Sequence, residues 1–82
     1  MPDTEKPRIL IVEDEAVTAK LLMSRVESFG YNVIGPARTG ESAIELALTK
    51  KPNLILMDIN LKGDMDGIEA AEKIRSQIPI ET

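Results

Sequence analysis

Three acidic residues that follow two apolar runs are the first candidates for chemistry in this sequence of 82 residues. Glu13 and Asp14 come directly after the run Ile9–Val12. Asp58 follows the run Leu54–Met57 in the same way. Continuous apolar runs of this length are typical of strands buried on both faces. Carboxylates held close together raise one another's pKa unless a cation neutralises them, so the pattern points to a hard divalent ion such as Mg²⁺.

The elements that position these acids form three strand–helix units in series. The expected strands are Ile9–Val12, Tyr31–Ile34 closed by Gly35-Pro36, and Leu54–Met57. The first expected helix is Ala16–Phe29, and Gly30 ends it. The second is capped by Thr39 and ends at Lys50-Lys51-Pro52. The third is capped by Asp66. Their predicted inner faces are Ala19, Leu22, Val26 and Phe29, then Ala43, Ile44, Ala47 and Leu48, then Ile68, Ala71, Ile74 and Ile78.

Three such units in series predict a doubly wound α/β fold with a parallel sheet and right-handed crossovers. Ligands bind such sheets beyond the carboxyl ends of the strands. If the strand order is 2-1-3, the strands before Glu13 and Asp58 are neighbours, and the acids converge. We expect residues 1–7 to be a disordered lead-in to a domain that starts at residue 8, and Pro79–Thr82 to begin a fourth strand.

Composition excludes several classes of site. The sequence contains no Cys and no His, so it cannot form a disulfide, a thiolate or imidazole zinc site, or a Ser-His or Cys-His nucleophile pair. Any metal must be bound by oxygen. A net charge of −4 with one Tyr and one Phe argues against direct nucleic-acid binding. No apolar run approaches the roughly 20 residues that span a bilayer, so we expect no membrane insertion and a cytoplasmic location.

Each acid also has a simpler explanation. Asp14 could cap the first helix, and Asp58 could be an Asx-turn residue at the end of a strand. Both readings stay open for the single residues. The joint occurrence favours the metal site, because placing acids at the ends of two adjacent buried strands is a poor way to stabilise a fold.

The sequence resembles the receiver domains of two-component response regulators. The resemblance covers nearly everything from Arg8 onward, and its motifs are Ile9–Glu15, Gly30-Tyr31, Leu54–Leu61 and Met65–Glu69. It implies a flavodoxin-like doubly wound sheet and a phospho-acceptor signalling domain. Such a domain is not an enzyme, beyond Mg²⁺-dependent self-phosphorylation from phosphodonors.

The resemblance also implies roles for four residues. Asp58 would accept a phosphoryl group from the phosphohistidine of a histidine kinase. Mg²⁺ would be bound by the side chains of Asp14 and Asp58, by the backbone carbonyl of Asn60, and by Glu13 through water.

The sequence departs from the family pattern. The family's domain has five strand–helix units, and residues 8–82 supply three, its N-terminal part. The family's Ser or Thr after strand four and Lys after strand five have no counterpart, because Thr82 lies too early and Lys62 lies in the loop after strand three. That loop is somewhat long, with Gly63 expected at a positive-φ turn.

An apolar sheet edge at Asn53–Asp58 predicts self-association. The alternative function is therefore a truncated or engineered fragment that self-associates and performs no phosphotransfer.

Two rival sites use the same acids. Asp58, Asn60, Gly63 and Glu69 match part of the calcium-loop pattern D-x-[DN]-x-[DN]-G-x5-E, but Lys62 occupies a ligand position. A nucleotide site would need a glycine-rich loop after the first strand, where the acids stand instead. A haloacid-dehalogenase-like phosphatase would need an Asp where Asn60 stands.

Overall fold

A computed structural model describes residues 6–58, 61, 63 and 65–78. The elements are β1 (Arg8–Val12), α1 (Ala16–Ser28), β2 (Asn32–Ala37), α2 (Gly40–Lys50), β3 (Leu54–Met57) and α3 (Gly67–Arg75). The predictions about residues 1–5, Asn60, Lys62 and Pro79–Thr82 lie outside the described residues.

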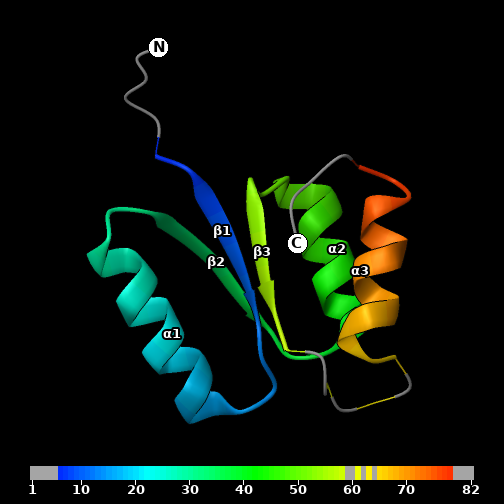
Figure 1. The fold of residues 1–82 in the computed structure, drawn as a ribbon, viewed down its shortest axis with the longest axis horizontal. Helices are drawn as coiled ribbons and strands as arrows, with labels where there is room; N and C mark the ends of the chain where they lie inside the picture. The colour runs from blue at the N-terminus through cyan, green and yellow to red at the C-terminus, as the bar shows by residue number, and fades with distance from the viewer. Residues whose placement is uncertain (1–5, 59–60, 62, 64, 79–82) are drawn as a thin grey trace.

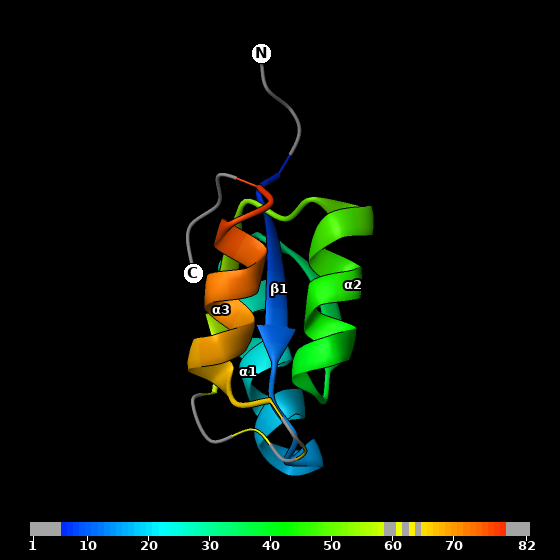
Figure 2. The same cartoon turned by 90° about the vertical axis from the view of Figure 1, so that its right-hand side faces the viewer.

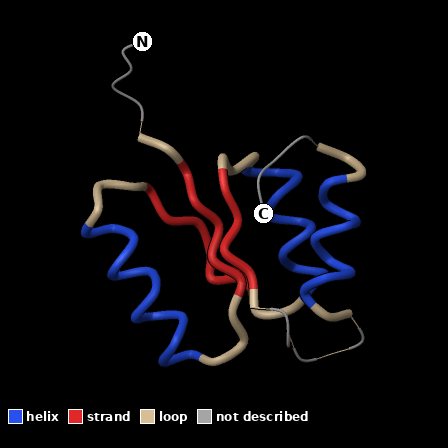
Figure 3. Tube along the Cα trace, in the orientation of Figure 1, coloured by secondary structure: helices blue, strands red, loops and turns tan. Residues whose placement is uncertain are grey.

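The strands form one parallel sheet in the order β2-β1-β3. Helix α1 covers one face, and α2 and α3 lie side by side on the other (Figures 1 and 2). The strands run between the two helical layers (Figure 3). This arrangement confirms the predicted doubly wound fold and the order 2-1-3. Within the described part of the chain, no helix is long and apolar enough to span a bilayer.

Strand β1 is the central strand, and its side chains contribute to the hydrophobic core on both faces of the sheet. Leu10 and Val12 pack with residues of α2 and α3, among them Ala43 and Ile74. Ile9 and Ile11 point to the opposite face and pack against Val26 of α1. The alternation follows from the two-residue period of a strand, and it explains why β1 is apolar at every position after Arg8.

Strand β2 differs from the prediction. It begins at Asn32 and continues through Gly35-Pro36 to Ala37, whereas the sequence pattern placed its end at Ile34. The register against β1 shifts here, because Leu10 pairs with Ile34 while Val12 pairs with Ala37. Gly35 has φ +108°, and a Cβ on it would lie 2.9 Å from the Ile11 carbonyl oxygen. Gly35 and Pro36 therefore form an irregularity within an edge strand and do not end it.

Strand β3 is buried less completely than its apolar run predicted. Ile55 is fully buried, but Leu56 remains 37% exposed. The described residues pair β3 only with β1, so β3 lies at an edge of this sheet.

Two predicted inner-face residues are exposed. Phe29 is 69% exposed because α1 ends at Ser28 and Phe29 is its C-cap, already outside the helical conformation. Ile68 is 56% exposed, since the buried face of α3 consists of Gly67, Ala70, Ala71 and Ile74. Ile68 follows Gly67 and is rotated about 100° from it around the helix axis.

The helix signals from Thr39, Asp66 and Gly30 are confirmed. Thr39 forms a capping box with Ser42 at the start of α2. The Asp66 side chain accepts a hydrogen bond from the Glu69 N–H at 2.9 Å and caps α3. Gly30 has the positive φ, +94°, expected after α1.

Candidate functional site

The carboxyl ends of β1 and β3 lie level with each other. Val12 pairs with Met57, and the Asp58 N–H donates to the Val12 carbonyl at 3.0 Å. On the other side of β1, the Glu13 N–H donates to the Ala37 carbonyl at 2.9 Å. These backbone bonds fix the residues that follow β1 and β3 at one edge of the sheet.

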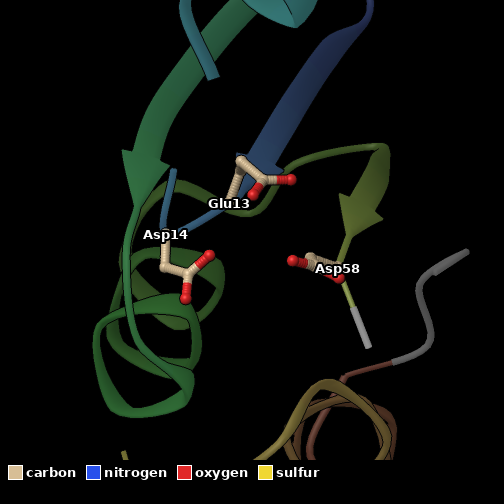
Figure 4. Close-up of side chains that lie close together, drawn as sticks. All are labelled: Glu13, Asp14 and Asp58. Carbon is tan, nitrogen blue, oxygen red and sulfur yellow. The ribbon is translucent and has the colours of Figure 1, made fainter. Parts of the chain in front are cut away.

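The predicted acids meet at this edge. Glu13, Asp14 and Asp58 each have a carboxylate oxygen within 4.8 Å of the others, and all three residues are half-buried. In Figure 4 the carboxyl groups of Asp14 and Asp58 point toward one another, with Glu13 beside them at the end of β1. The structure therefore brings together three of the four predicted metal-site residues, and Asn60 lies outside the described residues. We call these three residues the acidic cluster.

Asp14 is not the N-cap of α1. The N-cap is Glu15, and its side chain makes no capping hydrogen bond. Instead, the Glu15 N–H donates to a Glu13 carboxylate oxygen at 3.2 Å, and the Thr18 hydroxyl donates to the Glu15 carboxylate at 2.7 Å. The simpler explanation for Asp14 is thus wrong, because the chain enters the helix one residue later and leaves the Asp14 side chain in the acidic cluster.

The pKa of Glu13 is raised above its ordinary value of 4.5. The largest cause is desolvation by burial, and the negative charges of Asp58 and Asp14 add to it. The hydrogen bond from the Glu15 backbone acts in the opposite direction. A bound cation would reverse the repulsion, because positive charge favours the ionised form of every neighbouring carboxylate.

The donor set of the cluster fits a hard cation. It consists of carboxylate oxygens alone, which suit magnesium and calcium and do not suit metals that prefer sulfur or nitrogen ligands. Mg²⁺ is commonly held by one or two carboxylates, with water or phosphate oxygens in its other positions. The calcium-loop alternative loses support, because a strand, β3, precedes Asp58 where that motif has a helix.

The sequence did not single out Arg38, which follows β2. Its guanidinium group donates a hydrogen bond to the backbone carbonyl of Asp14 at 3.3 Å. This bond ties the β2–α2 connection to the β1–α1 loop. No spacing rule pairs residues 24 positions apart, so only the fold reveals the contact.

The connection from β3 to α3 is fixed against the core at Leu61, which is buried in the same cluster as Ala43 and Ile74. Gly63 has φ +105°, which confirms the predicted positive-φ turn. The connection ends at Asp66, the cap of α3.

A parallel α/β sheet in the order 2-1-3 with acids at the carboxyl ends of its first and third strands is typical of phospho-acceptor signalling domains. The sequence profile of the family "Response regulator receiver domain" matches residues 9–81. The chain belongs to this family, whose members act in two-component signalling.

The relatives agree with this assignment. The transcriptional regulatory protein PdtaR of Mycobacterium tuberculosis is 41% identical over 70 residues, which are 85% of this chain and 34% of PdtaR. The chain thus spans about a third of that relative's length.

The solved structures agree as well. The anti-anti-sigma factor PhyR of Bartonella quintana matches with TM-score 0.84 and 37% identity, over 96% of this chain and 32% of PhyR. The signal receiver domain of a modulated diguanylate cyclase from Desulfovibrio desulfuricans matches with TM-score 0.83 and 38% identity, over 89% of this chain and 58% of that domain.

Proposed function

We propose that this chain accepts a phosphoryl group on Asp58 from the phosphohistidine of a histidine kinase, with Mg²⁺ bound at the acidic cluster. The observation that carries the proposal is the convergence of Glu13, Asp14 and Asp58 within 4.8 Å in a member of the receiver family. Receiver domains interact with histidine kinases and with other protein partners.

The reaction is a transfer between two nucleophiles. A carboxylate oxygen of Asp58 attacks phosphorus, the P–N bond to the kinase imidazole breaks, and its electron pair stays on the imidazole nitrogen. The product is an acyl phosphate on Asp58. A carboxylate is ionised near neutral pH, so the acceptor needs no general base and no histidine of its own.

Mg²⁺ would be held by the side chains of Asp14 and Asp58, by Glu13 through water, and by the backbone carbonyl of Asn60. When bound, the ion would supply positive charge that offsets the negative charge on the phosphoryl oxygens. The chain's own contribution is to hold Asp58 at the end of β3 and Asp14 opposite it, with the backbone of Asp14 tied to Arg38. We propose an acceptor that is phosphorylated once per signal and not an enzyme with turnover.

Self-association is a further part of the proposal. In the described residues β3 is an edge strand with an exposed Leu56, and an open apolar edge favours pairing with another chain. The alternative function, a self-associating fragment without phosphotransfer, shares this feature and differs only in its chemistry. The phosphorylation experiment separates the two functions.

The test is the intact mass of the chain after incubation with Mg²⁺ and a small acyl phosphate donor. We expect a phosphoryl adduct that disappears in Asp58→Asn and when EDTA removes the metal. Asp66→Asn is the matched control, because Asp66 caps α3 outside the acidic cluster, and its adduct should remain. A folded chain that forms no adduct would contradict the proposal and favour the structural alternative.

A further inference from the structure

Gly40, the first residue of α2, lies directly against Met65 of the β3–α3 connection. A Cβ built on Gly40 would lie 2.9 Å from both Cγ and Sδ of Met65 and 3.1 Å from its Cβ. Real Cβ atoms essentially never approach other atoms to 2.9 Å. The side chain of Met65 therefore occupies the space that any other residue at position 40 would fill.

Backbone conformation does not explain the glycine. Gly40 begins α2 and lies outside the positive-φ region, unlike Gly30, Gly35 and Gly63. Alanine is the better helix former, so helix propensity alone favours it at this position. The remaining reason for glycine is the close approach of Met65.

Met65 lies at a point where its position matters for the site. It directly precedes Asp66, whose side chain caps α3. The same connection starts at Asp58 in the acidic cluster and passes through Leu61, which is buried against the core face that contains Ala43 of α2. The described part of the connection is thus held against α2 at Leu61 and at Met65, and α2 and α3 lie side by side (Figure 2).

We propose that Gly40 is a positioning residue: because it has no side chain, Met65 can pack against α2, and this contact holds the described part of the connection that follows Asp58. The effect on metal binding rests on the proposed function, whereas the contact itself does not. The role is assigned to a residue outside the acidic cluster, and it acts only through Met65.

The first experiment tests the contact in metal-free protein. Amide hydrogen exchange at Leu61 is measured by NMR in EDTA for the wild type, Gly40→Ala, Met65→Ala and the double variant. We expect Gly40→Ala to accelerate amide exchange at Leu61. In the Met65→Ala background the clashing side chain is gone, so adding Gly40→Ala should not change the exchange rate at Leu61. Glu45→Ala, an exposed change in α2, is the control for general effects on the helix.

Unchanged exchange in Gly40→Ala would overturn the inference, and so would an equal acceleration in the Met65→Ala background. If Gly40→Ala does not fold, the double variant is the test. A double variant that folds supports the packing of Met65 against Gly40, and a double variant that does not fold overturns it.

The second experiment measures Mg²⁺ affinity calorimetrically for the same variants. Losing a direct hydrogen-bond partner of a metal ligand commonly costs 10–100-fold in affinity, and Gly40 acts one step further away, so we expect Gly40→Ala to weaken Mg²⁺ binding by less than about tenfold. The loss should not appear when Gly40→Ala is added to Met65→Ala. A wild type that binds Mg²⁺ with the same affinity as Gly40→Ala overturns the positioning role. A wild type that binds no Mg²⁺ overturns the proposed function instead, and the exchange data still decide the contact.

Discussion

Glu13 connects the stability of the fold with the chemistry of the site. Its backbone N–H bonds to Ala37 of β2, while its carboxylate shares the acidic cluster with Asp14 and Asp58. Burial and the two neighbouring charges raise its pKa, so the ionised side chain opposes folding, and a bound cation would offset this cost. The cluster is therefore an arrangement that a fold would not adopt for stability alone.

Replacing Glu13 with Gln should stabilise the metal-free chain at neutral pH. The folded pKa of Glu13 lies above the ordinary value of 4.5, so the unfolded chain releases the proton first as pH rises. Wild-type stability attributable to Glu13 is thus greatest below about pH 4.5 and falls until pH exceeds the raised folded pKa. Gln does not titrate. The difference in free energy of unfolding between Glu13→Gln and the wild type should therefore grow as pH rises through this range, and then level off.

Urea unfolding from pH 4 to pH 8 in EDTA measures this difference. Glu45→Gln, which removes a charge from the exposed face of α2, reports the general effect of a lower net negative charge. If the gain in free energy of unfolding from Glu13→Gln stays constant or shrinks as pH rises, then the ionised Glu13 side chain does not oppose folding.

At the scale of the elements, sequence signals were reliable where local chemistry decides. The Thr39 side chain accepts from the Ser42 N–H and the Asp66 side chain from the Glu69 N–H, and the spacing alone identified both caps. The predicted end of β2 at Ile34 was wrong, because Gly-Pro pairs usually mark a turn and Gly35-Pro36 lies within the strand. Here the Ile11 backbone passes close to Gly35, a long-range approach that no local pattern contains.

Thr39→Ala should destabilise the chain by about 1 kcal/mol, because it leaves an N-terminal N–H of α2 without its side-chain acceptor. Thr49→Ala is the matched control: the Thr49 hydroxyl donates to the Glu45 carbonyl in the last turn of the same helix and caps nothing. We expect the control to change the free energy of unfolding by less than about 0.5 kcal/mol. Equal losses in the two variants, measured by urea unfolding, would contradict the role of the cap.

At the scale of the whole molecule, two acidic segments about 45 residues apart in sequence meet because β1 lies between β2 and β3. That β1 and β3 are neighbours could be predicted from the acids, since only adjacent strands bring them together, whereas the full order 2-1-3 came from the flavodoxin-like sheet that the family resemblance implies. The contacts of Arg38 with Asp14 and of Gly40 with Met65 could not, because they depend on how connections from different units pack at the sheet edge.

Among the described residues β3 is an edge strand, and this gives the last prediction, a concentration-dependent mass in solution. Leu56 is 37% exposed on this strand, and a lysine there should hinder pairing because charged side chains on an edge strand oppose the approach of a second chain. Sedimentation equilibrium should show that Leu56→Lys lowers self-association while circular dichroism stays native-like. Ile68→Lys is the control, since Ile68 is 56% exposed and belongs to α3, not to β3. A wild type that is monomeric at every concentration, or an equal effect of both lysines, would exclude the β3 edge as the contact surface.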